Sequence, residues 1–323
     1  MYRIIHPSKI IFGLNSAKNY SYPLKPLIIT SNGAAKRGWL EYLGINDYEL
    51  FDEVEPNPSM ETVNEITSRF NFLSISTVIG IGGGSSLDVA KYVAFKMQKE
   101  KILIPTTFGS GSEVTRISVL KINGKKRSFH DDKMISDVAI IDPFFIKNTP
   151  FTIIKNSAVD ACAQCTEAFD SKNSNDYTKF LCQKAFDILE DSILNETFEK
   201  LSLGSLISGL GFGNSSTTLG HALSYIYSNE GFSHGHALAF TTLAAHKYNH
   251  SIFYERFKKI IEKLDFTPIR ISSSINEAAE LILEDRKHLD NNPKVVSKND
   301  IISILEKIDN KTFSEIESTH CIR

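Results

Sequence analysis

The segment Thr77–Lys91, TVIGIGGGSSLDVAK, restricts the possible folds of this chain more than any other segment. The apolar run Val78–Ile81 has the length and β-branched content of a buried strand, and helical spacing of apolar residues follows the glycines. Gly82–Gly84 separate the two, and Ser85 and Ser86 offer side chains for an N-cap. Backbone N–H groups and the helix dipole at such a junction can bind a phosphate. A tight turn without a ligand is the alternative, but three glycines cost conformational entropy without adding packing, which favours the phosphate site.

The composition is that of a soluble globular protein. The 323 residues include 41% hydrophobic and 23% charged side chains, enough for two domains with a sizeable core. A net charge of -2 gives no reason to expect nucleic acid or an anionic membrane as a partner. We find no apolar run of transmembrane length, no signal-peptide pattern and no secreted disulfide framework among the four cysteines. We therefore expect a cytoplasmic protein.

The first half of the chain alternates between strand and helix patterns. Strands are expected at 26–30, 48–51, 78–81, 102–105 and 137–142, with helical segments between them, notably 60–72. This alternation predicts a parallel sheet with helices on its faces. Glu113–Ile122 and the polar return after it predict a β-hairpin, because Asn123-Gly124 is a strong turn signal.

After Pro150 the pattern is almost entirely helical. We expect an α/β domain at 1–147 and an all-α domain at 148–323. The expected helices are 156–168, 177–194, 198–210, 217–227, 235–248, 277–288 and 300–308.

A second loop rich in Gly, Ser and Thr follows the strand at 102–105. Its sequence, Ile104–Glu113, is typical of a polar connection rich in turn formers. Two such loops at the ends of separate parallel strands would also line one crevice, where open α/β sheets bind ligands.

Four side chains of the helical half form a candidate metal site. Asp160 and Gln164 lie four apart in a helical segment, so their side chains share one face. His221 and His234 lie in or beside two other helical stretches. A carboxylate, an amide oxygen and two imidazoles suit Fe2+ or Zn2+. Spacing alone favours the alternative, in which each histidine is an interior side chain with its hydrogen bonds satisfied.

The spacing Cys162-Ala-Gln-Cys165 invites a redox or zinc interpretation. The pair lies inside a helical segment that no strand precedes, and neither cysteine shares the Asp160/Gln164 face. We expect buried core thiols.

Four motifs carry a family resemblance. GIGGGSSLDVAK, IPTTFGSGSEVTR, SDVAIIDP and the SHG around His234 occur in the order and near the spacing of the iron-containing (group III) alcohol dehydrogenases. The chain resembles that family from about residue 8 to about residue 250. The resemblance implies a dehydroquinate synthase-like fold, with a dinucleotide-binding α/β domain, an all-helical domain and a metal site in the cleft between them. It also implies NAD(P)H and a divalent metal (Fe2+ or Zn2+) as cofactors, a small aldehyde or alcohol as substrate, and a homodimer formed through the N-terminal strand region, Met1–Phe12.

The resemblance assigns roles to individual residues. The cofactor pyrophosphate would be held by Gly82, Gly83, Gly84 and Ser85, with Asp88 and Lys91 matching the GGGSxxDxxK pattern, and the nicotinamide and ribose would be flanked by Thr106, Thr107 and Ser110. The metal ligands would be Asp160, His221 and His234, with Gln164 where most of the family has histidine. His221 and His234 are also one residue closer than in the usual pattern.

Two further features refine the expected specificity. Members that prefer NAD often have Asp after the first strand, whereas Ser31 here leaves room for the 2′-phosphate of NADPH. DACAQCTEAF and HALSYIYSNEGFSHGHALAF resemble the phosphonoacetaldehyde reductase branch, although the Pro-Leu-Thr of that branch is missing at Ile226–Ser228. The Lys125–Arg127 cations could face a phosphonate, or form a solvated hairpin rim.

The leading functional hypothesis is reversible hydride transfer between NAD(P)H and a small aldehyde, with the metal as Lewis acid. His236 or His246 could relay the proton, although a histidine two residues from a ligand can also simply support the site. The alternatives are a dehydroquinate synthase-like lyase or cyclase, and a nucleotide-binding paralogue with little or no catalysis. Gln164 and the short region after Tyr248 keep the second alternative open.

Overall fold

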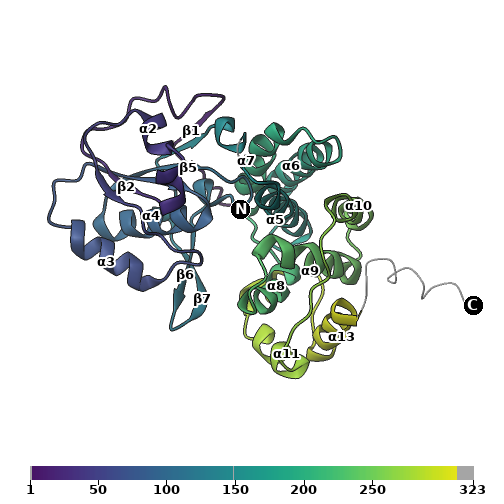
Figure 1. Ribbon diagram of the computed structural model, residues 1–323. Helices are drawn as coiled ribbons and strands as arrows, with labels where there is room; N and C mark the ends of the chain where they lie inside the picture. Colours follow the sequence, from purple (N-terminus) through teal and green to yellow (C-terminus); the bar gives the residue numbers. More distant parts are fainter. Residues whose placement is uncertain (1, 148, 311–323) are drawn as a thin grey trace, which may run out of the picture. The chain divides into compact units, whose positions relative to one another are not determined.

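The computed structural model describes residues 2–147 and 149–310. The chain divides after Pro150 into two compact units, which are described separately below. The domain boundary expected between residues 147 and 148 touches residue 148, which lies outside the described residues. Figure 1 shows strands and helices in the first unit, and helices in the described part of the second.

The first unit contains a six-stranded parallel sheet, as the sequence predicts. Its strand order is β1-β8-β5-β4-β2-β3, and every neighbouring pair is parallel. The six strands are β1 (Lys9–Phe12), β2 (Leu27–Ile29), β3 (Glu49–Phe51), β4 (Thr77–Gly82), β5 (Glu100–Pro105) and β8 (Val138–Ile141). The helices of this unit are α1 (Asn32–Lys36), α2 (Trp39–Leu43), α3 (Met60–Phe70) and α4 (Gly84–Met97), with short 3-10 helices η1 (Ser112–Val114), η2 (Asp132–Met134) and η3 (Pro143–Ile146).

Both faces of the sheet are covered by apolar side chains. Leu27 and Ile29 of β2 belong to a cluster with buried residues of α3 and α4, whereas Ile28 belongs to a second cluster with residues of α2 and η3. Figure 1 shows α3 and α4 on one side of the sheet and α2 on the other. All six residues of β4 are buried, because a central parallel strand is covered on both faces.

The junction between β4 and α4 differs from the expectation in one detail. We expected Ser85 or Ser86 to cap the helix, and this is wrong, because α4 begins at Gly84 with Gly83 as N-cap and no side-chain cap bond. Gly83 has the extended backbone of an N-cap residue (φ -75°, ψ 179°), which starts the helix before the serines.

The hairpin signal is confirmed. β6 (Ile117–Ile122) and β7 (Lys125–His130) form a separate antiparallel pair. Asn123 and Gly124 both have positive φ, of 51° and 75°, as a two-residue type I′ turn requires. The first residues of the expected strand, Glu113 and Val114, instead lie in η1.

The second unit is helical throughout its regular structure in the described residues. Its elements are α5 (Phe151–Asp170), α6 (Asp176–Leu194), η4 (Phe198–Lys200), α7 (Leu201–Phe212), α8 (Leu219–Asn229), α9 (His234–Asn249), α10 (Tyr254–Leu264), α11 (Ile275–Leu283), α12 (Arg286–Asn291) and α13 (Lys298–Asn310). None of the described helices is long and apolar enough to cross a lipid bilayer.

The C-terminal helices differ from the expectation in two ways. We did not predict α10, and we predicted 277–288 as one helix, whereas α11 ends at Leu283 and α12 begins at Arg286. Asp285 separates them because its side chain accepts a hydrogen bond from the backbone N–H of His288 and so caps a new helix.

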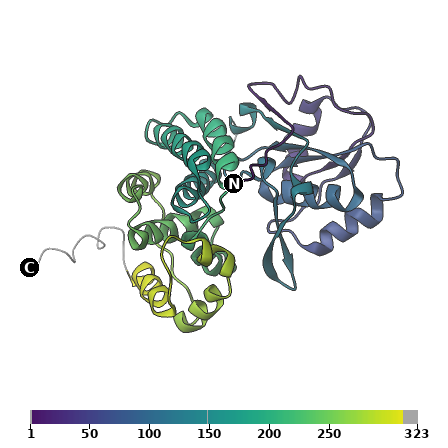
Figure 2. The same ribbon diagram turned by 180° about the vertical axis from the view of Figure 1, so that it is seen from behind.

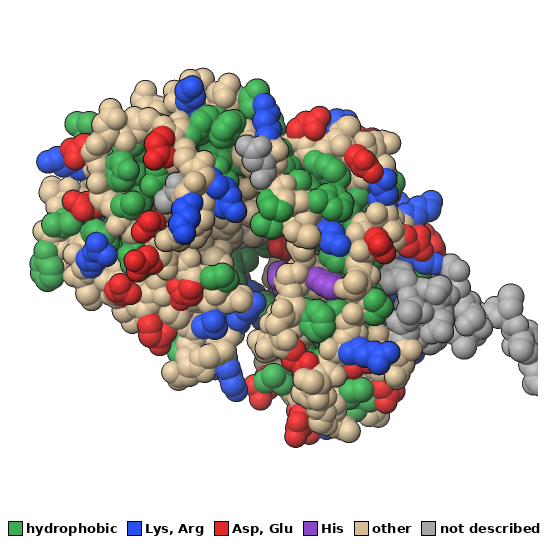
Figure 3. All heavy atoms as spheres, viewed as in Figure 1, with side chains coloured by type: hydrophobic (Ala, Val, Ile, Leu, Met, Phe, Trp, Pro, Cys, Tyr) green, Lys and Arg blue, Asp and Glu red, His purple; other side chains and the backbone are tan. Residues whose placement is uncertain are grey.

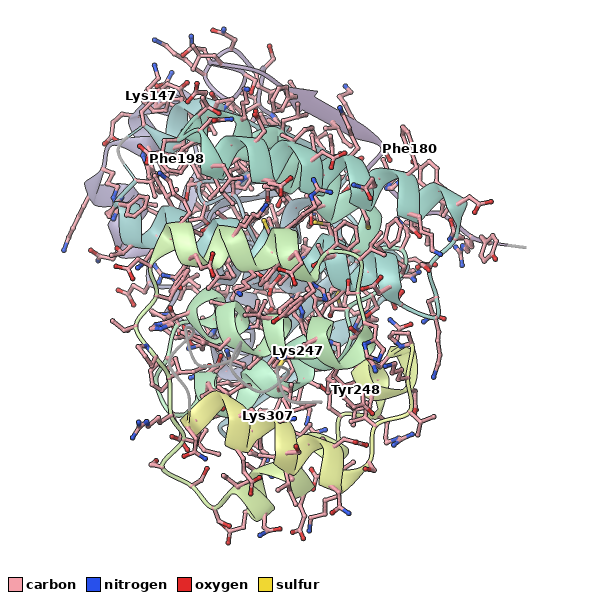
Figure 4. The ribbon with its side chains drawn as sticks, turned by 90° about the vertical axis from the view of Figure 1, so that its right-hand side faces the viewer. Lys147, Phe180, Phe198, Lys247, Tyr248 and Lys307 are labelled. Carbon is pink, nitrogen blue, oxygen red and sulfur yellow. The ribbon has the colours of Figure 1, made fainter. Side chains whose placement is uncertain are left out.

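The segment before α13 is tied back to α9. The hydroxyl of Tyr248 donates to the carbonyl of Val295 (2.8 Å), and Lys294 Nζ donates to the carbonyl of Tyr248 (2.7 Å). Figure 4 shows Tyr248 beside the yellow helices, and Figures 1 and 2 show α11 and α13 together at one end of the unit. These contacts join the segment between α12 and α13 to α9, the helix that begins at His234.

Candidate functional site

One face of α5 supplies three polar side chains to the interior of the helical unit. Asp160, Gln164 and Glu167 occur at i, i+4 and i+7, so they lie along a single face. The Asp160 side chain is 14% exposed, while Gln164 and Glu167 are buried. A buried polar stripe of this kind needs partners on the neighbouring helices.

Those partners include two histidines. His221 lies near the start of α8, and His234 is the first residue of α9. One ligand atom from each of Asp160, His221 and His234 lies within 4.8 Å of the other two. The Nε2 atoms of the histidines are 3.8 and 3.9 Å from the same oxygen, Asp160 Oδ1. The structure therefore brings together three of the four side chains proposed from the sequence.

The fourth side chain, Gln164, contacts the carboxylate of the cluster. Its Nε2 donates a hydrogen bond to Asp160 Oδ1 at 2.9 Å. This contact holds the carboxylate oxygen that both histidines face. In this arrangement Gln164 orients Asp160.

Glu167 holds His221 from the opposite side of the ring. Its Oε2 lies 3.1 Å from His221 Nδ1 and accepts a hydrogen bond from the backbone N–H of Thr218 at 2.6 Å. Burial alone would raise the pKa of Glu167, but the charge and hydrogen bond of His221 offset it and lower that pKa to about 2. Burial would likewise lower the pKa of His221, but the carboxylates of Glu167 and Asp160 raise it to about 9.

The donor set fits a divalent metal ion. A carboxylate and two imidazole nitrogens are ligands that Zn2+ and Fe2+ both accept. Glu167 beside the second nitrogen of His221 is the carboxylate partner that ligating histidines usually have. His234 is a third exposed at its side chain, and Figure 3 shows histidine atoms at the surface of the helical unit.

The two Gly/Ser-rich loops of the first unit meet at the carboxyl ends of adjacent strands. Thr106 follows β5, and its backbone N–H donates to the carbonyl of Gly82, at the end of β4 (2.9 Å). A Cβ on Gly84 would lie 2.9 Å from the Cβ of Ser110, so only glycine permits this approach. Gly82 has φ +149°, a conformation that side chains rarely adopt. The start of α4 and the second loop thus form one polar surface, which includes the predicted cofactor residues Gly83, Ser85 and Thr107.

Asp88 and Lys91 are placed differently from the other predicted cofactor residues. Lys91 is fully buried, lies 3.3 Å from Asp88 Oδ1 and donates to the carbonyls of Thr115 and Ile117. Asp88 accepts from Ser112 Oγ (2.6 Å) and from a backbone N–H of β6. These bonds are internal, so we propose that the pair holds the second loop rather than contacting the cofactor.

The two histidines proposed as proton relays lie elsewhere. His236 Nε2 is 2.6 Å from the carbonyl oxygen of Thr267, and its ring packs among phenylalanines. His246 is buried, its Nε2 is 2.8 Å from Thr166 Oγ1, and burial lowers its pKa to about 4. Neither ring belongs to the metal-binding group, so a relay role for them stays a prediction that these contacts do not support.

The cysteine expectation is confirmed. Cys162 and Cys165 are buried free thiols, and burial raises the pKa of each. Cys165 Sγ donates to the carbonyl of Cys162, one turn earlier in α5.

The remaining residues that the sequence suggested are Ser31 and the cations of the β6–β7 hairpin. Ser31 follows β2, the strand beside β4, and is partly exposed. Lys125 and Arg127 are exposed on β7, with Lys126 between them. Figure 3 shows Lys and Arg side chains near this hairpin.

Three side chains close to the candidate metal ligands Asp160, His221 and His234 were not predicted from the sequence. Glu167 could have been found, because it is seven residues after Asp160 on a predicted helix. Tyr225 lies one turn after His221, and its ring is 6.2 Å from that of His234. His288 comes from α12, far along the chain, and no spacing pattern connects it to the others.

Comparison with known proteins agrees with this geometry. Residues 7–143 match the family described as iron-containing alcohol dehydrogenase, and residues 154–280 match the C-terminal part of the Fe-containing alcohol dehydrogenase family. The chain belongs to the iron-containing alcohol dehydrogenase family. The resemblance inferred from the four sequence motifs is thereby confirmed at the level of the family, without the phosphonoacetaldehyde branch.

Individual relatives show how far the likeness extends. The 4-hydroxybutyrate dehydrogenase of Clostridium kluyveri is 31% identical over 268 residues, which cover 74% of this chain and 67% of that protein. The chain spans about a quarter to two thirds of the length of the curated relatives matched first.

Solved structures share the fold. An iron-containing alcohol dehydrogenase from Thermotoga maritima has a TM-score of 0.85 and 24% identity, covering 96% of this chain and 100% of that one. Sulfoacetaldehyde reductase from Bifidobacterium kashiwanohense, solved in complex with NAD+, has a TM-score of 0.85 and 21% identity, covering 99% of both chains. The predicted fold class is therefore confirmed.

Proposed function

We propose that this chain is a metal-dependent oxidoreductase that interconverts a small aldehyde and a primary alcohol with NAD(P)H. The observation that carries the proposal is the convergence of Asp160, His221 and His234 from three helices onto one group of ligand atoms. In a family described as iron-containing alcohol dehydrogenases, this group is the natural place for the metal.

The metal site would be held by these three side chains. When bound, Fe2+ or Zn2+ would supply a Lewis acid for the substrate oxygen. Glu167 lies at hydrogen-bond distance from Nδ1 of His221, so Nε2 would be the nitrogen that binds the metal. Gln164 holds Asp160 Oδ1 from the same helix. A buried carboxylate beside a ligating histidine also makes that ring more basic and therefore a stronger metal ligand.

The cofactor would bind to the first unit. Backbone N–H groups at the start of α4, together with the helix dipole, suit the pyrophosphate. Thr106, Thr107 and Ser110 would lie beside the ribose and nicotinamide, and Ser31 at the neighbouring strand end would allow NADPH as well as NADH. The NAD+ complex of the sulfoacetaldehyde reductase supports a nicotinamide cofactor.

The substrate would be a small aldehyde that carries an anionic group. Two relatives are named for anionic compounds, the alcohol 4-hydroxybutyrate with its carboxylate and the aldehyde sulfoacetaldehyde with its sulfonate. The reduction of phosphonoacetaldehyde to 2-hydroxyethylphosphonate is the specific case that the sequence suggests. The exposed cations Lys125 and Arg127 would then bind the anionic group of the substrate.

We also propose a cytoplasmic homodimer. β1 is an edge strand, paired on one side with β8. Its other edge offers backbone groups to a second copy of the chain. The side chain of Phe12, at the end of β1, is 45% exposed.

The proposal is tested by oxidation of NADPH and NADH in the presence of Fe2+ or Zn2+. Phosphonoacetaldehyde, sulfoacetaldehyde, succinic semialdehyde and propanal would be compared as substrates, with Asp160→Asn as the inactive variant. Turnover that is lost in Asp160→Asn supports the proposal, and preference for the three anionic aldehydes supports the substrate class. Tight cofactor and metal binding without turnover of any aldehyde would contradict the proposal and favour a non-catalytic paralogue or a lyase.

A further inference from the structure

His288 lies against the metal-binding cluster although no sequence pattern places it there. Its ring is 6.2 Å from that of His221, centroid to centroid, with an angle of 20° between the planes. It is also 5.9 Å from the ring of Tyr225. Tyr225 in turn contacts His234, and His234 contacts His221 at 5.5 Å. The four rings therefore form a closed circuit of contacts, of which two members are proposed metal ligands.

Hydrogen bonds at both ends of α12 fix the position of His288. Its Nδ1 lies 2.6 Å from Asp285 Oδ2, and the other oxygen of Asp285 accepts from the backbone N–H of His288. At the end of the same helix, Asn291 Nδ2 donates to the carbonyls of Ser215 and Thr217, which precede α8. α12 is thus anchored to the loop that leads into the helix carrying His221.

The Asp285–His288 pair repeats the arrangement of Glu167 and His221. In each pair a carboxylate lies within hydrogen-bond distance of Nδ1, at 2.6 Å and 3.1 Å respectively. A carboxylate can only accept, so Nδ1 carries a hydrogen, and Nε2 is the ring nitrogen that can accept one. The difference is distance, because His288 is not among the residues whose ligand atoms lie within 4.8 Å of one another.

An acceptor at this position suits a substrate better than a metal. The side chain of His288 is only 7% exposed. A primary alcohol whose oxygen is at the metal carries one O–H hydrogen, which needs an acceptor once water is excluded. An aldehyde has no such hydrogen.

We propose that His288, held by Asp285, is a substrate-binding residue that accepts a hydrogen bond from the hydroxyl of the alcohol. Tyr225 forms the adjoining wall. The inference rests on the proposed function, because it places the alcohol oxygen at the metal-binding cluster. It makes His288 a determinant of how tightly the alcohol, rather than the aldehyde, is bound.

The experiment measures binding of a non-reacting alcohol, 2,2,2-trifluoroethanol, to the Zn2+-loaded full-length protein with NAD+, by calorimetry. His288→Ala should weaken its binding by about 3- to 10-fold, the worth of one hydrogen bond. His288→Gln, whose amide oxygen is also an acceptor, should retain most of the affinity. Asp285→Asn should give an intermediate loss, because the ring is held less firmly. Arg286→Ala, an exposed change on the same helix at a residue that pairs with Asp290, is the matched control and should leave binding unchanged.

The outcomes separate this inference from the proposed function. Equal trifluoroethanol affinity in the wild type and His288→Ala would overturn it, as would an equal loss in His288→Ala and His288→Gln, which would indicate packing alone. Loss of Zn2+ from His288→Ala, measured by metal analysis, would make His288 a ligand and would also overturn it. Failure of the proposed function would instead appear as a wild type that binds Zn2+ and trifluoroethanol but turns over no aldehyde.

Discussion

Glu167→Gln is the most informative change to the metal site that does not touch a ligand. The side chain is buried and accepts hydrogen bonds from the backbone and hydroxyl of Thr218, at 2.6 and 3.2 Å, in addition to its contact with His221. Glutamine has the same shape and keeps an acceptor, but removes the charge that faces the imidazole. The substitution therefore isolates the carboxylate–histidine interaction.

The magnitude follows from the shifted pKa values. The pKa of Glu167 falls from 4.5 to about 2, and that of His221 rises from 6.5 to about 9. Each pKa change corresponds to roughly 3 kcal/mol, and both contain the Glu167–His221 interaction, so they are not added. Asp160 also contributes to the raised pKa of His221, and the Thr218 backbone N–H to the lowered pKa of Glu167. Because the amide still accepts one hydrogen bond, we expect the metal-free variant to lose about 2–3 kcal/mol of stability at pH 6.

The pH dependence has a definite sign. The lowered pKa of Glu167 gives stability that is present above pH 4.5 and is lost as the pH falls toward 2. The raised pKa of His221 gives stability that is present below pH 6.5 and is lost as the pH rises through 9. The difference in stability between the metal-free wild type and Glu167→Gln should therefore be largest between pH 4.5 and 6.5.

Metal affinity provides the second readout. Loss of the carboxylate beside a ligating histidine typically lowers metal affinity by about 10- to 100-fold. Urea denaturation measures the stability of the metal-free proteins. Competition with a chromogenic chelator measures their Zn2+ affinity. Glu190→Gln is the control, because Glu190 pairs with Arg256 away from the cluster and should leave Zn2+ affinity unchanged. A Glu167→Gln variant with wild-type stability and wild-type Zn2+ affinity would refute the reasoning.

Three further predictions concern other parts of the chain. Gly84→Ala should raise the KM for NAD(P)H, because a Cβ would lie 2.9 Å from that of Ser110; an unchanged KM would show that this approach is not needed for the cofactor. Burial raises the pKa of Glu113 from 4.5 to about 7, so its stability contribution is full below pH 4.5 and falls as the pH rises through 7. Glu113→Gln should accordingly gain up to about 3 kcal/mol relative to the wild type at pH 8 but not at pH 4, by urea denaturation. Gln164→His should tighten Zn2+ binding by adding an imidazole, and unchanged affinity in the chelator assay would argue that residue 164 only orients Asp160.

Local signals in the sequence were sufficient for most of the sheet domain. The β-branched run before Gly82 is the central strand β4, and Asn123-Gly124 adopts the two positive φ angles that its residue types favour. The capping of α4 was missed because a glycine with extended backbone can begin a helix without a side-chain cap. A serine near a helix start therefore indicates the start only to within a residue or two.

The helical domain was harder to predict for a different reason. α10 carries the apolar stripe Phe257, Ile260, Ile261 and Leu264, so its helical periodicity is present in the sequence. His288 could not have been placed in the same way. Its approach to His221 depends on Asp285 starting a new helix and on Asn291 anchoring that helix to a loop more than 70 residues earlier. Such contacts arise from tertiary packing and leave no periodic signal in the chain.

Asp160, His221 and His234 are proposed to hold a catalytic divalent metal. The most direct measurement is the metal content of the wild type and of Asp160→Asn after Zn2+ or Fe2+ loading and dialysis, with NAD(P)H oxidation measured on the same samples. We predict one bound ion per wild-type chain, lost together with aldehyde reduction in the variant, while NAD(P)H binding persists. Aldehyde reduction that continues in Asp160→Asn without bound metal would contradict the claim.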